Sequence, residues 1–199
     1  KGYENLVKSS KSVGNKFKVQ RFDAVTPRSV DNVMIESEVK WNYPWEGEIT
    51  DFSTGLTKRY YPTKDKRKRM ACSMSHFSLW QLCFESRKPI IILEHDAMFV
   101  NQIDFNIKDT KFDILGLNNP LMSTRKAHDY YDKIVKKFDA FQYAPYIDDD
   151  VKIPQGLAGN SAYMMTPEGA EKMISLTYKH GVWPNDALMC RQLVDKLGV

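Results

Sequence analysis

The feature that most constrains the fold is a short apolar run over residues 90–93, which follows Pro89 and stops at Glu94, His95 and Asp96. A continuous apolar run bounded by breakers is typical of a strand that is buried on both faces, and such strands lie in the middle of α/β sheets. Ligands of open α/β sheets bind just beyond the carboxyl ends of the strands. The run therefore predicts a central strand with a ligand site at its end.

Glu94 and Asp96 stand two residues apart at this strand end. In an extended chain, positions i and i+2 point to the same face. Two carboxylates on one face form an oxygen-rich site that suits a hard divalent cation such as Mg²⁺ or Mn²⁺. The alternative is that both are solvated residues of an ordinary turn.

The rest of the chain alternates between helical and strand patterns, which indicates an α/β fold. The expected helices cover residues 1–14, 29–35, 70–86, 124–138, 167–181 and 185–197. The expected strands cover residues 17–25, 90–93, 112–118 and 141–146, with a further strand approached by 155–166. The helix over 70–86 carries the clearest apolar stripe. His76 lies beside that stripe and is expected to be packed and hydrogen-bonded.

Residues 36–68 lack clean periodicity and are rich in aromatic side chains, glycine and proline. A structureless loop of this length is unusual in a compact domain and is often functional. The segment closes on a basic run over residues 64–69. This run is either a solvated basic face or a contact for phosphate groups of a ligand.

The composition is that of a globular chain with enough residues, 199, for one domain with its own core. The net charge of +4 permits anionic substrates but does not argue for nucleic acid. No window approaches the roughly 18 consecutive apolar residues of a membrane span. The three cysteines are scattered, which favours a reducing compartment. We expect a cytoplasmic protein, with the secretory lumen as the alternative if a signal precedes Lys1.

Five segments, in this order along the chain, resemble glycosyltransferase family 25, the enzymes of lipopolysaccharide sugar transfer and of collagen hydroxylysine galactosylation. The resemblance is carried by Arg21-Phe-Asp-Ala-Val25, Met70-Ala-Cys-Ser-Met-Ser-His-Phe-Ser-Leu-Trp80, Ile91-Ile-Leu-Glu-His-Asp-Ala97, Gly159-Asn-Ser-Ala-Tyr163 with Gly169-Ala-Glu-Lys172, and Pro184-Asn-Asp186.

The chain also departs from the family pattern. His95 stands where the family's L-E-D-D motif has a carboxylate, and Asn160 stands where the family has threonine. The first nucleotide-binding strand of the family has no counterpart here. We therefore expect residues 1–199 to form a single glycosyltransferase domain that lacks an N-terminal strand and a C-terminal extension.

The resemblance implies a GT-A-like fold, in which a mixed, mostly parallel sheet is flanked by helices. It implies transfer of a hexose, glucose or galactose, from a UDP-sugar to a glycan or hydroxylysine-type hydroxyl, with Mn²⁺ or Mg²⁺. Glu94 and Asp96 would hold the metal or the donor, and Asn160 would contact the donor. Asp186 would be the general base, with its pKa lowered by a helix N-terminus. The residue-based alternative for Asp186 is a helix cap.

Two other classes of function stay open. A non-catalytic module that binds a nucleotide sugar or a glycan would follow if His95 weakens the metal site. A nucleic-acid-binding domain would use residues 64–69 with the aromatic side chains before them, and its affinity would fall steeply with salt. The resemblance favours the enzyme, without nucleic acid as a partner.

Overall fold

The computed structural model describes residues 2–122, 126–136 and 141–199. Its helices are α1 (Gly2–Ser12), α2 (Val30–Glu36), α3 (Lys66–Ser86), α4 (Ala127–Val135), α5 (Pro167–His180) and α6 (Asn185–Leu188), with short 3-10 turns at Ile107–Asp109 and Pro120–Met122. Its strands are β1 (Glu48–Asp51), β2 (Leu56–Arg59), β3 (Ile90–Leu93), β4 (Ile114–Gly116), β5 (Ala162–Met165) and β6 (Leu197–Gly198). The ends of the helix expected over 124–138 lie outside the described residues.

The main sheet has four strands in the order β3-β5-β4-β6. β5 runs antiparallel to both β3 and β4, and only β4 and β6 pair in parallel. The expectation of a mostly parallel sheet is therefore wrong, and β3 lies at an edge of this sheet instead of its centre. A buried strand has the same apolar sequence pattern whether its neighbour is parallel or antiparallel. The run at β3 therefore could not predict the direction of β3 relative to β5.

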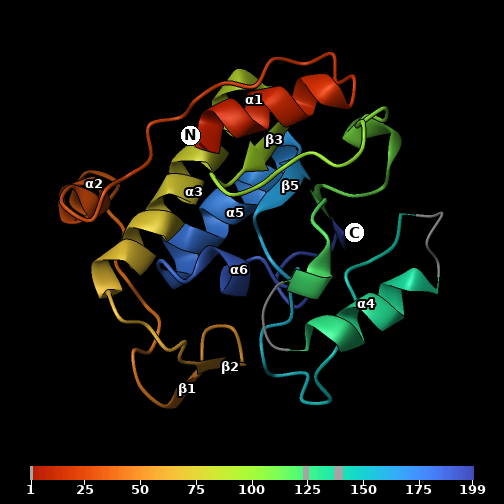
Figure 1. Cartoon of the computed structure of the whole chain (residues 1–199). Helices are drawn as coiled ribbons and strands as arrows, with labels where there is room; N and C mark the ends of the chain where they lie inside the picture. Colours follow the sequence, from red (N-terminus) through yellow and green to blue (C-terminus); the bar gives the residue numbers. More distant parts are fainter. Residues whose placement is uncertain (1, 123–125, 137–140) are drawn as a thin grey trace.

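Helices α3 and α5 pack on the sheet and against one another (Figure 1). Their contact places Met74, Phe77 and Trp80 of α3 in the main core, together with Met173 of α5. Both helices begin at a side-chain cap: Asp65 accepts a hydrogen bond from the backbone N–H of Lys68, and Thr166 accepts one from Gly169. The apolar stripe and the Thr166-Pro167 start predicted from the sequence are confirmed. Among the described helices, none is long and apolar enough to cross a membrane.

Residues 36–68 are more ordered than their sequence suggests, because β1 and β2 form an antiparallel hairpin within them. Lys58 is 1% exposed, and its Nζ lies 2.8 Å from Oδ2 of Asp51. Ser53 in the hairpin turn bonds both Asp51 and Nδ1 of His180, at the end of α5. The hairpin is thus tied to the helical layer by a buried polar network, which holds it as one wall of the site.

Three expected elements differ from the structure. Residues 17–25 form no strand, because none of the described strands pairs with them; the N–H of Val25 instead donates to Oγ of Ser75. The strand expected over 141–146 is reduced to a bridge between Tyr143 and Gly198. The last helix ends at Leu188, since the chain then turns to bridge Gly156.

Candidate functional site

The site lies at the edge of the sheet where β3 and β4 end. Both strands run antiparallel to β5, so their carboxyl ends meet beside the start of β5. The N–H of Glu94 donates to the carbonyl of Ser161 at 2.8 Å, and the Asn118 amide donates to the carbonyl of Ala158 at 2.7 Å. This sheet edge therefore brings Glu94 and the segment around Asn160 together, although their sequence positions are far apart.

Glu94 begins a turn instead of continuing the strand. The N–H of Ala97 donates to the carbonyl of Glu94 at 3.1 Å, with His95 and Asp96 in the turn. The same-face rule for residues i and i+2 holds only in an extended chain. The premise that placed Glu94 and Asp96 on one strand face is therefore wrong. Asp96 and His95 are exposed, whereas the Glu94 side chain is 32% exposed and faces α3.

One face of α3 supplies three side chains to this region. Arg69, Cys72 and His76 follow one another at spacings of three and four, which places them on one face of the helix. The Cys72 thiol, the His76 imidazole and the Glu94 carboxylate have ligand atoms that all lie within 4.8 Å of one another. Loss of hydration and the charges of Glu94 and Asp186 raise the pKa of the Cys72 thiol to about 11.

A chain of buried hydrogen bonds connects the core of the protein to Glu94. Trp80 Nε1 donates to the hydroxyl of Tyr163 at 2.9 Å, and that hydroxyl lies 2.8 Å from Nδ1 of His76. Nε2 of His76 lies 3.3 Å from Oε1 of Glu94. Tyr163 is fully buried, and burial raises its pKa far above the ordinary value, so the hydroxyl keeps its proton.

The direction of these bonds fixes the tautomer of His76. An indole N–H only donates, so the Tyr163 oxygen accepts from Trp80 and its own proton needs an acceptor. Among the residues that the structure describes, Nδ1 of His76 lies within hydrogen-bond distance as an acceptor. His76 therefore carries its proton on Nε2 and donates it to Glu94. The expectation that His76 is packed and hydrogen-bonded is confirmed, and its partner is a predicted site residue.

Asn160 is 8% exposed, and neither of its side-chain polar atoms, Oδ1 and Nδ2, has a hydrogen-bond partner among the described residues. An unpaired buried amide costs about 1–3 kcal/mol. Such a group at a strand edge is suited to a ligand that supplies the missing partners. The resemblance implies that Asn160 contacts the donor, and that role stays a prediction.

Asp186 is the second residue of α6, and Pro184 occupies the N-cap position without a side-chain bond. Asp186 is thus not the cap of this helix. Burial raises the pKa of Asp186 above its ordinary value; the charge of Arg69 and two backbone N–H groups oppose this, and the charge of Glu94 adds to it. The expected lowering is wrong, because a helix of one turn cannot offset the loss of hydration. Oδ1 of Asp186 is buried without a partner among the described residues.

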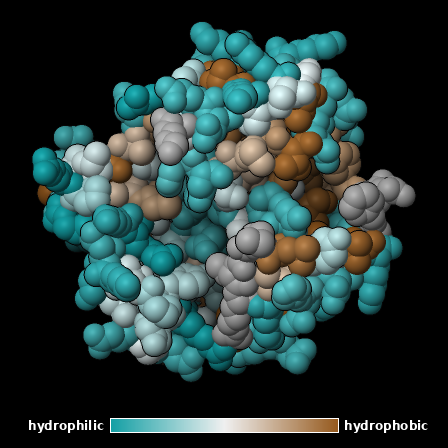
Figure 2. Space-filling view, viewed as in Figure 1, coloured by the Kyte–Doolittle hydropathy of each residue, from teal (hydrophilic) through white to brown (hydrophobic). Residues whose placement is uncertain are grey.

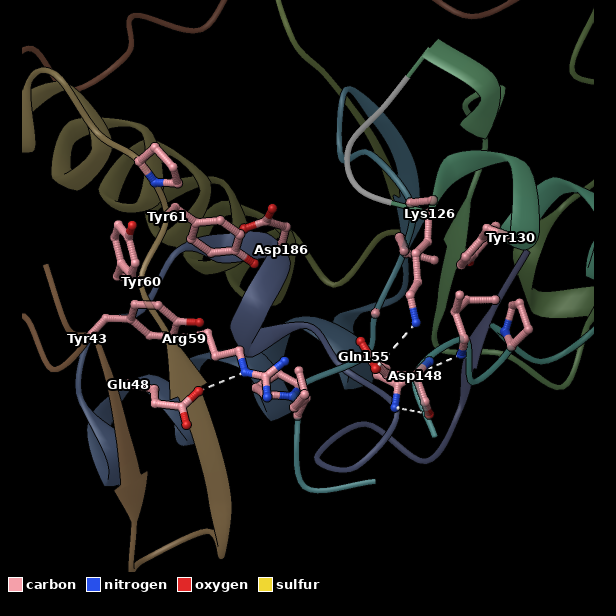
Figure 3. A pocket seen from close by; sticks show the side chains of 18 of the residues that line it. Tyr43, Glu48, Arg59, Tyr60, Tyr61, Lys126, Tyr130, Asp148, Gln155 and Asp186 are labelled. Atoms are coloured by element: carbon pink, nitrogen blue, oxygen red, sulfur yellow. Dashed lines mark hydrogen bonds and ion pairs between the residues drawn. The ribbon is translucent and has the colours of Figure 1, made fainter. Parts of the chain in front are cut away.

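Asp186 is also one of the residues that line a pocket of about 860 Å³. Figure 3 shows Tyr43, Tyr60, Tyr61 and Asp186 on one side of it and Lys126 and Tyr130 on the other. The rings of Tyr43 and Tyr61 are stacked with centroids 5.9 Å apart, and the guanidinium of Arg69 lies 5.1 Å from the Tyr61 ring. Figure 2 shows this face of the molecule hollowed near its centre, with hydrophilic residues in the hollow and to its left and hydrophobic residues to its right.

The side chains of the basic run over residues 64–69 do not all have the same surroundings: some make structural contacts, and one reaches the site. Arg67 bonds the carboxylate of Asp31 and the carbonyl of Pro27, so it holds α2 against α3. Lys66 lies 5.4 Å from the Trp45 ring. Arg69 alone of these three reaches the site, where its charge acts on Asp186 and Cys72.

Sequence reasoning named Arg69 only as one member of the basic run over residues 64–69, and it missed Cys72 and the tyrosine-lined pocket. The spacing of Arg69, Cys72 and His76 was a readable signal for one shared face of a helix. What the spacing could not show is that this face lies against Glu94. Tyr43 and Tyr61 flank the hairpin that sequence reasoning left as a loop.

Comparison with known proteins gives one match. The family model for glycosyltransferase family 25 (LPS biosynthesis protein) matches residues 5–189. No curated protein and no solved structure matches the chain.

Proposed function

The chain belongs to glycosyltransferase family 25, and we propose that it transfers a hexose, glucose or galactose, from a UDP-sugar to a hydroxyl group of a glycan or protein. The family implies a sugar donor and an acceptor. We further propose a divalent cation, Mn²⁺ or Mg²⁺, and a GT-A-like arrangement in which the donor lies at the carboxyl ends of β3 and β4. Open α/β sheets bind nucleotides at such an edge.

Glu94 and Asp96 are the proposed holders of the cation. Both carboxylates reach solvent. That suits Mg²⁺ or Mn²⁺, which keep several waters and bind through one or two carboxylates plus phosphate oxygens of the substrate. A bound cation supplies charge neutralisation for the departing nucleoside diphosphate, which gains negative charge as the glycosidic bond breaks.

Asn160 and Arg69 are the proposed contacts of the donor. The buried Asn160 amide has both a donor and an acceptor to offer, and it has no partner among the described residues. Arg69 brings a positive charge within electrostatic reach of Asp186 and Cys72. Its guanidinium can bond two phosphate oxygens at once. Because the departing diphosphate carries more negative charge than the intact donor, Arg69 would bind it more strongly.

Asp186 is the proposed general base, and its position carries the proposal. It lines the tyrosine pocket, and its ionisation is also affected by Arg69 and Glu94. It therefore stands between a pocket of suitable size for sugar rings and the proposed donor side. A carboxylate with a raised pKa is a stronger base than an ordinary one, which favours removal of the acceptor's proton. The tyrosine rings offer faces on which a pyranose ring can stack.

The test is a panel of UDP-hexoses incubated with the protein, Mn²⁺ and a mixture of hydroxyl acceptors. Release of UDP that depends on both the hexose and the metal, and that stops when the metal is chelated, supports the proposal. Tight Mn²⁺-dependent UDP binding without turnover of any hexose would favour a binding module of the same family. Absence of both binding and turnover would contradict the proposal.

A further inference from the structure

A second kind of metal site is built into the same region. Cys72 and His76 are four residues apart on α3, and Glu94 faces them from the end of β3. Their sulfur, nitrogen and oxygen ligand atoms lie within 4.8 Å of one another. Ligands that share a tetrahedral ion with bonds of about 2.0–2.3 Å stand roughly 3.3–3.8 Å apart, so small side-chain adjustments bring the three atoms onto one ion.

The donor set is soft compared with a carboxylate pair. A thiolate and an imidazole favour Zn²⁺, whereas Mg²⁺ and Mn²⁺ prefer carboxylates, carbonyls and water. Catalytic zinc sites typically have three protein ligands and a fourth position that is open to solvent. Cys72 is exposed, so the fourth position is reachable by water. We propose that Cys72, His76 and Glu94 form a Zn²⁺-binding site that is distinct in its donor set from the proposed Glu94–Asp96 cation site.

The surroundings of His76 suit a ligand histidine. A metal-bound imidazole donates its other ring N–H to a neighbouring oxygen, which sets its orientation. The Tyr163 hydroxyl lies 2.8 Å from Nδ1 and is held in place by Trp80. An ion bound at Nε2 requires the His76 proton on Nδ1, from which it is donated to the Tyr163 oxygen. The Tyr163 hydroxyl then loses Nδ1 as its acceptor, a cost that the bond to the ion must exceed. The Cys72 thiol loses its proton to solvent, so each ion releases one proton.

The two sites compete because they share Glu94. An ion held by Cys72 and His76 draws the Glu94 carboxylate towards α3 and away from Asp96. Zn²⁺ would then inhibit sugar transfer by removing a holder of the catalytic cation. This consequence for transfer rests on the proposed function, whereas binding of Zn²⁺ itself does not.

The direct test uses Co²⁺ as a coloured substitute for Zn²⁺ with the purified full chain. We expect a thiolate-to-Co²⁺ charge-transfer band at one ion per chain, and its loss when Zn²⁺ is added. Cys72→Ser should abolish the band, and Glu94→Gln should weaken Co²⁺ affinity by at least about tenfold. Glu85→Gln is the matched control, because Glu85 is an exposed carboxylate of α3 that belongs to neither proposed donor set; its affinity should stay unchanged. A band that persists in Cys72→Ser, or that disappears in Glu85→Gln, would overturn the site.

A second measurement needs no variant. Cys72 is exposed, whereas Cys83 and Cys190 are buried with 0% exposure, so a thiol reagent added to the native protein should modify Cys72 before the other two thiols. We expect Zn²⁺ to slow that reaction by at least about tenfold, as a coordinated thiolate is withheld from the reagent, and Mg²⁺ to leave it unchanged. An unprotected thiol at saturating Zn²⁺ would also overturn the proposal. Neither measurement depends on sugar transfer, so a failed transferase assay leaves this test intact.

Discussion

The imidazole Nε2 of His76 lies 3.3 Å from Oε1 of Glu94, and the ring is held from behind by Tyr163. Through this contact, the core of the protein sets the orientation of a carboxylate at the sheet edge. Trp80, Tyr163 and His76 are each at most 3% exposed. The position of Glu94 is therefore tied to the packing of α3 on β5.

The buried hydroxyl of Tyr163 should contribute measurably to stability. Tyr163→Phe removes the acceptor of the Trp80 N–H and the donor to His76, and it leaves buried polar groups unpaired. We expect a loss of about 1–3 kcal/mol in the free energy of unfolding, measured by urea denaturation. Tyr178→Phe is the control, because Tyr178 is 54% exposed and its change should be close to zero. Equal stabilities of the two variants would contradict the hydrogen-bond chain.

The network that holds the hairpin predicts a loss of stability in acid. Burial lowers the pKa of His180; the charges of Lys179 and Lys58 lower it further, and Asp51 opposes them. Burial alone would raise the pKa of Asp51, but hydrogen bonds from Lys58 and Ser53 lower it overall. A group whose pKa is lowered on folding stabilises the protein above its unfolded pKa, and that contribution disappears as the pH falls.

The expected result is a urea midpoint that falls from pH 7.5 to pH 5.5, as His180 is protonated more readily in the unfolded chain. A second fall should follow near and below the ordinary pKa of aspartate, from Asp51. His180→Gln should flatten the first fall and leave the second. An unchanged slope between pH 7.5 and pH 5.5 in that variant would show that His180 is not responsible.

Asp96 is the proposed metal holder that can be changed with the least effect on the fold, because its side chain is exposed in the turn after β3. Asp96→Asn keeps the shape and removes the charge. We expect Mn²⁺-dependent UDP binding to weaken by at least about tenfold, as loss of even an outer partner of a metal costs that much, with the thermal midpoint unchanged. Titration of UDP with and without Mn²⁺ measures this, and an unaltered Mn²⁺ dependence would exclude Asp96.

His95 replaces a family carboxylate, yet it occupies an exposed turn position next to Asp96. We predict that it does not coordinate the cation directly. His95→Asp should then leave the affinity for Mn²⁺ within roughly threefold of the original value, since an exposed side chain that neither coordinates the cation nor orients one of its ligands has little effect on the site. A much larger gain or loss in the same titration would identify position 95 as a ligand.

Local signals in the sequence were enough to predict several elements. The stripe of α3 and the Thr166-Pro167 start of α5 each act through neighbours in sequence, so their elements could be predicted. The direction of β5 relative to β3 depends on a pairing between residues about 70 apart, such as Ile92 with Tyr163, and no local signal encodes it. The hairpin was missed because its main anchor is a buried lysine, Lys58, which reads as a surface residue.

Some features of the site could likewise be predicted from the sequence, and others could not. The strand-end rule correctly brought Glu94 to the sheet edge where the segment of Asn160 also lies. The raised pKa of Asp186 could not be foreseen, because its largest cause is burial, which depends on how distant parts of the chain pack around this carboxylate. Likewise, Arg69 belongs to a basic run whose members look equivalent in the sequence, and only the direction of the helix face separates it from Arg67.

The general-base role of Asp186 is the central claim, and Asp186→Asn tests it most directly. The transfer rate and the UDP affinity are measured side by side, with Asp195→Asn as the control because Asp195 is exposed and has no part in the site. We predict that Asp186→Asn lowers kcat by about 10²-fold or more, the usual contribution of a general base, while UDP affinity stays close to normal. Near-normal transfer by the asparagine variant would contradict the account.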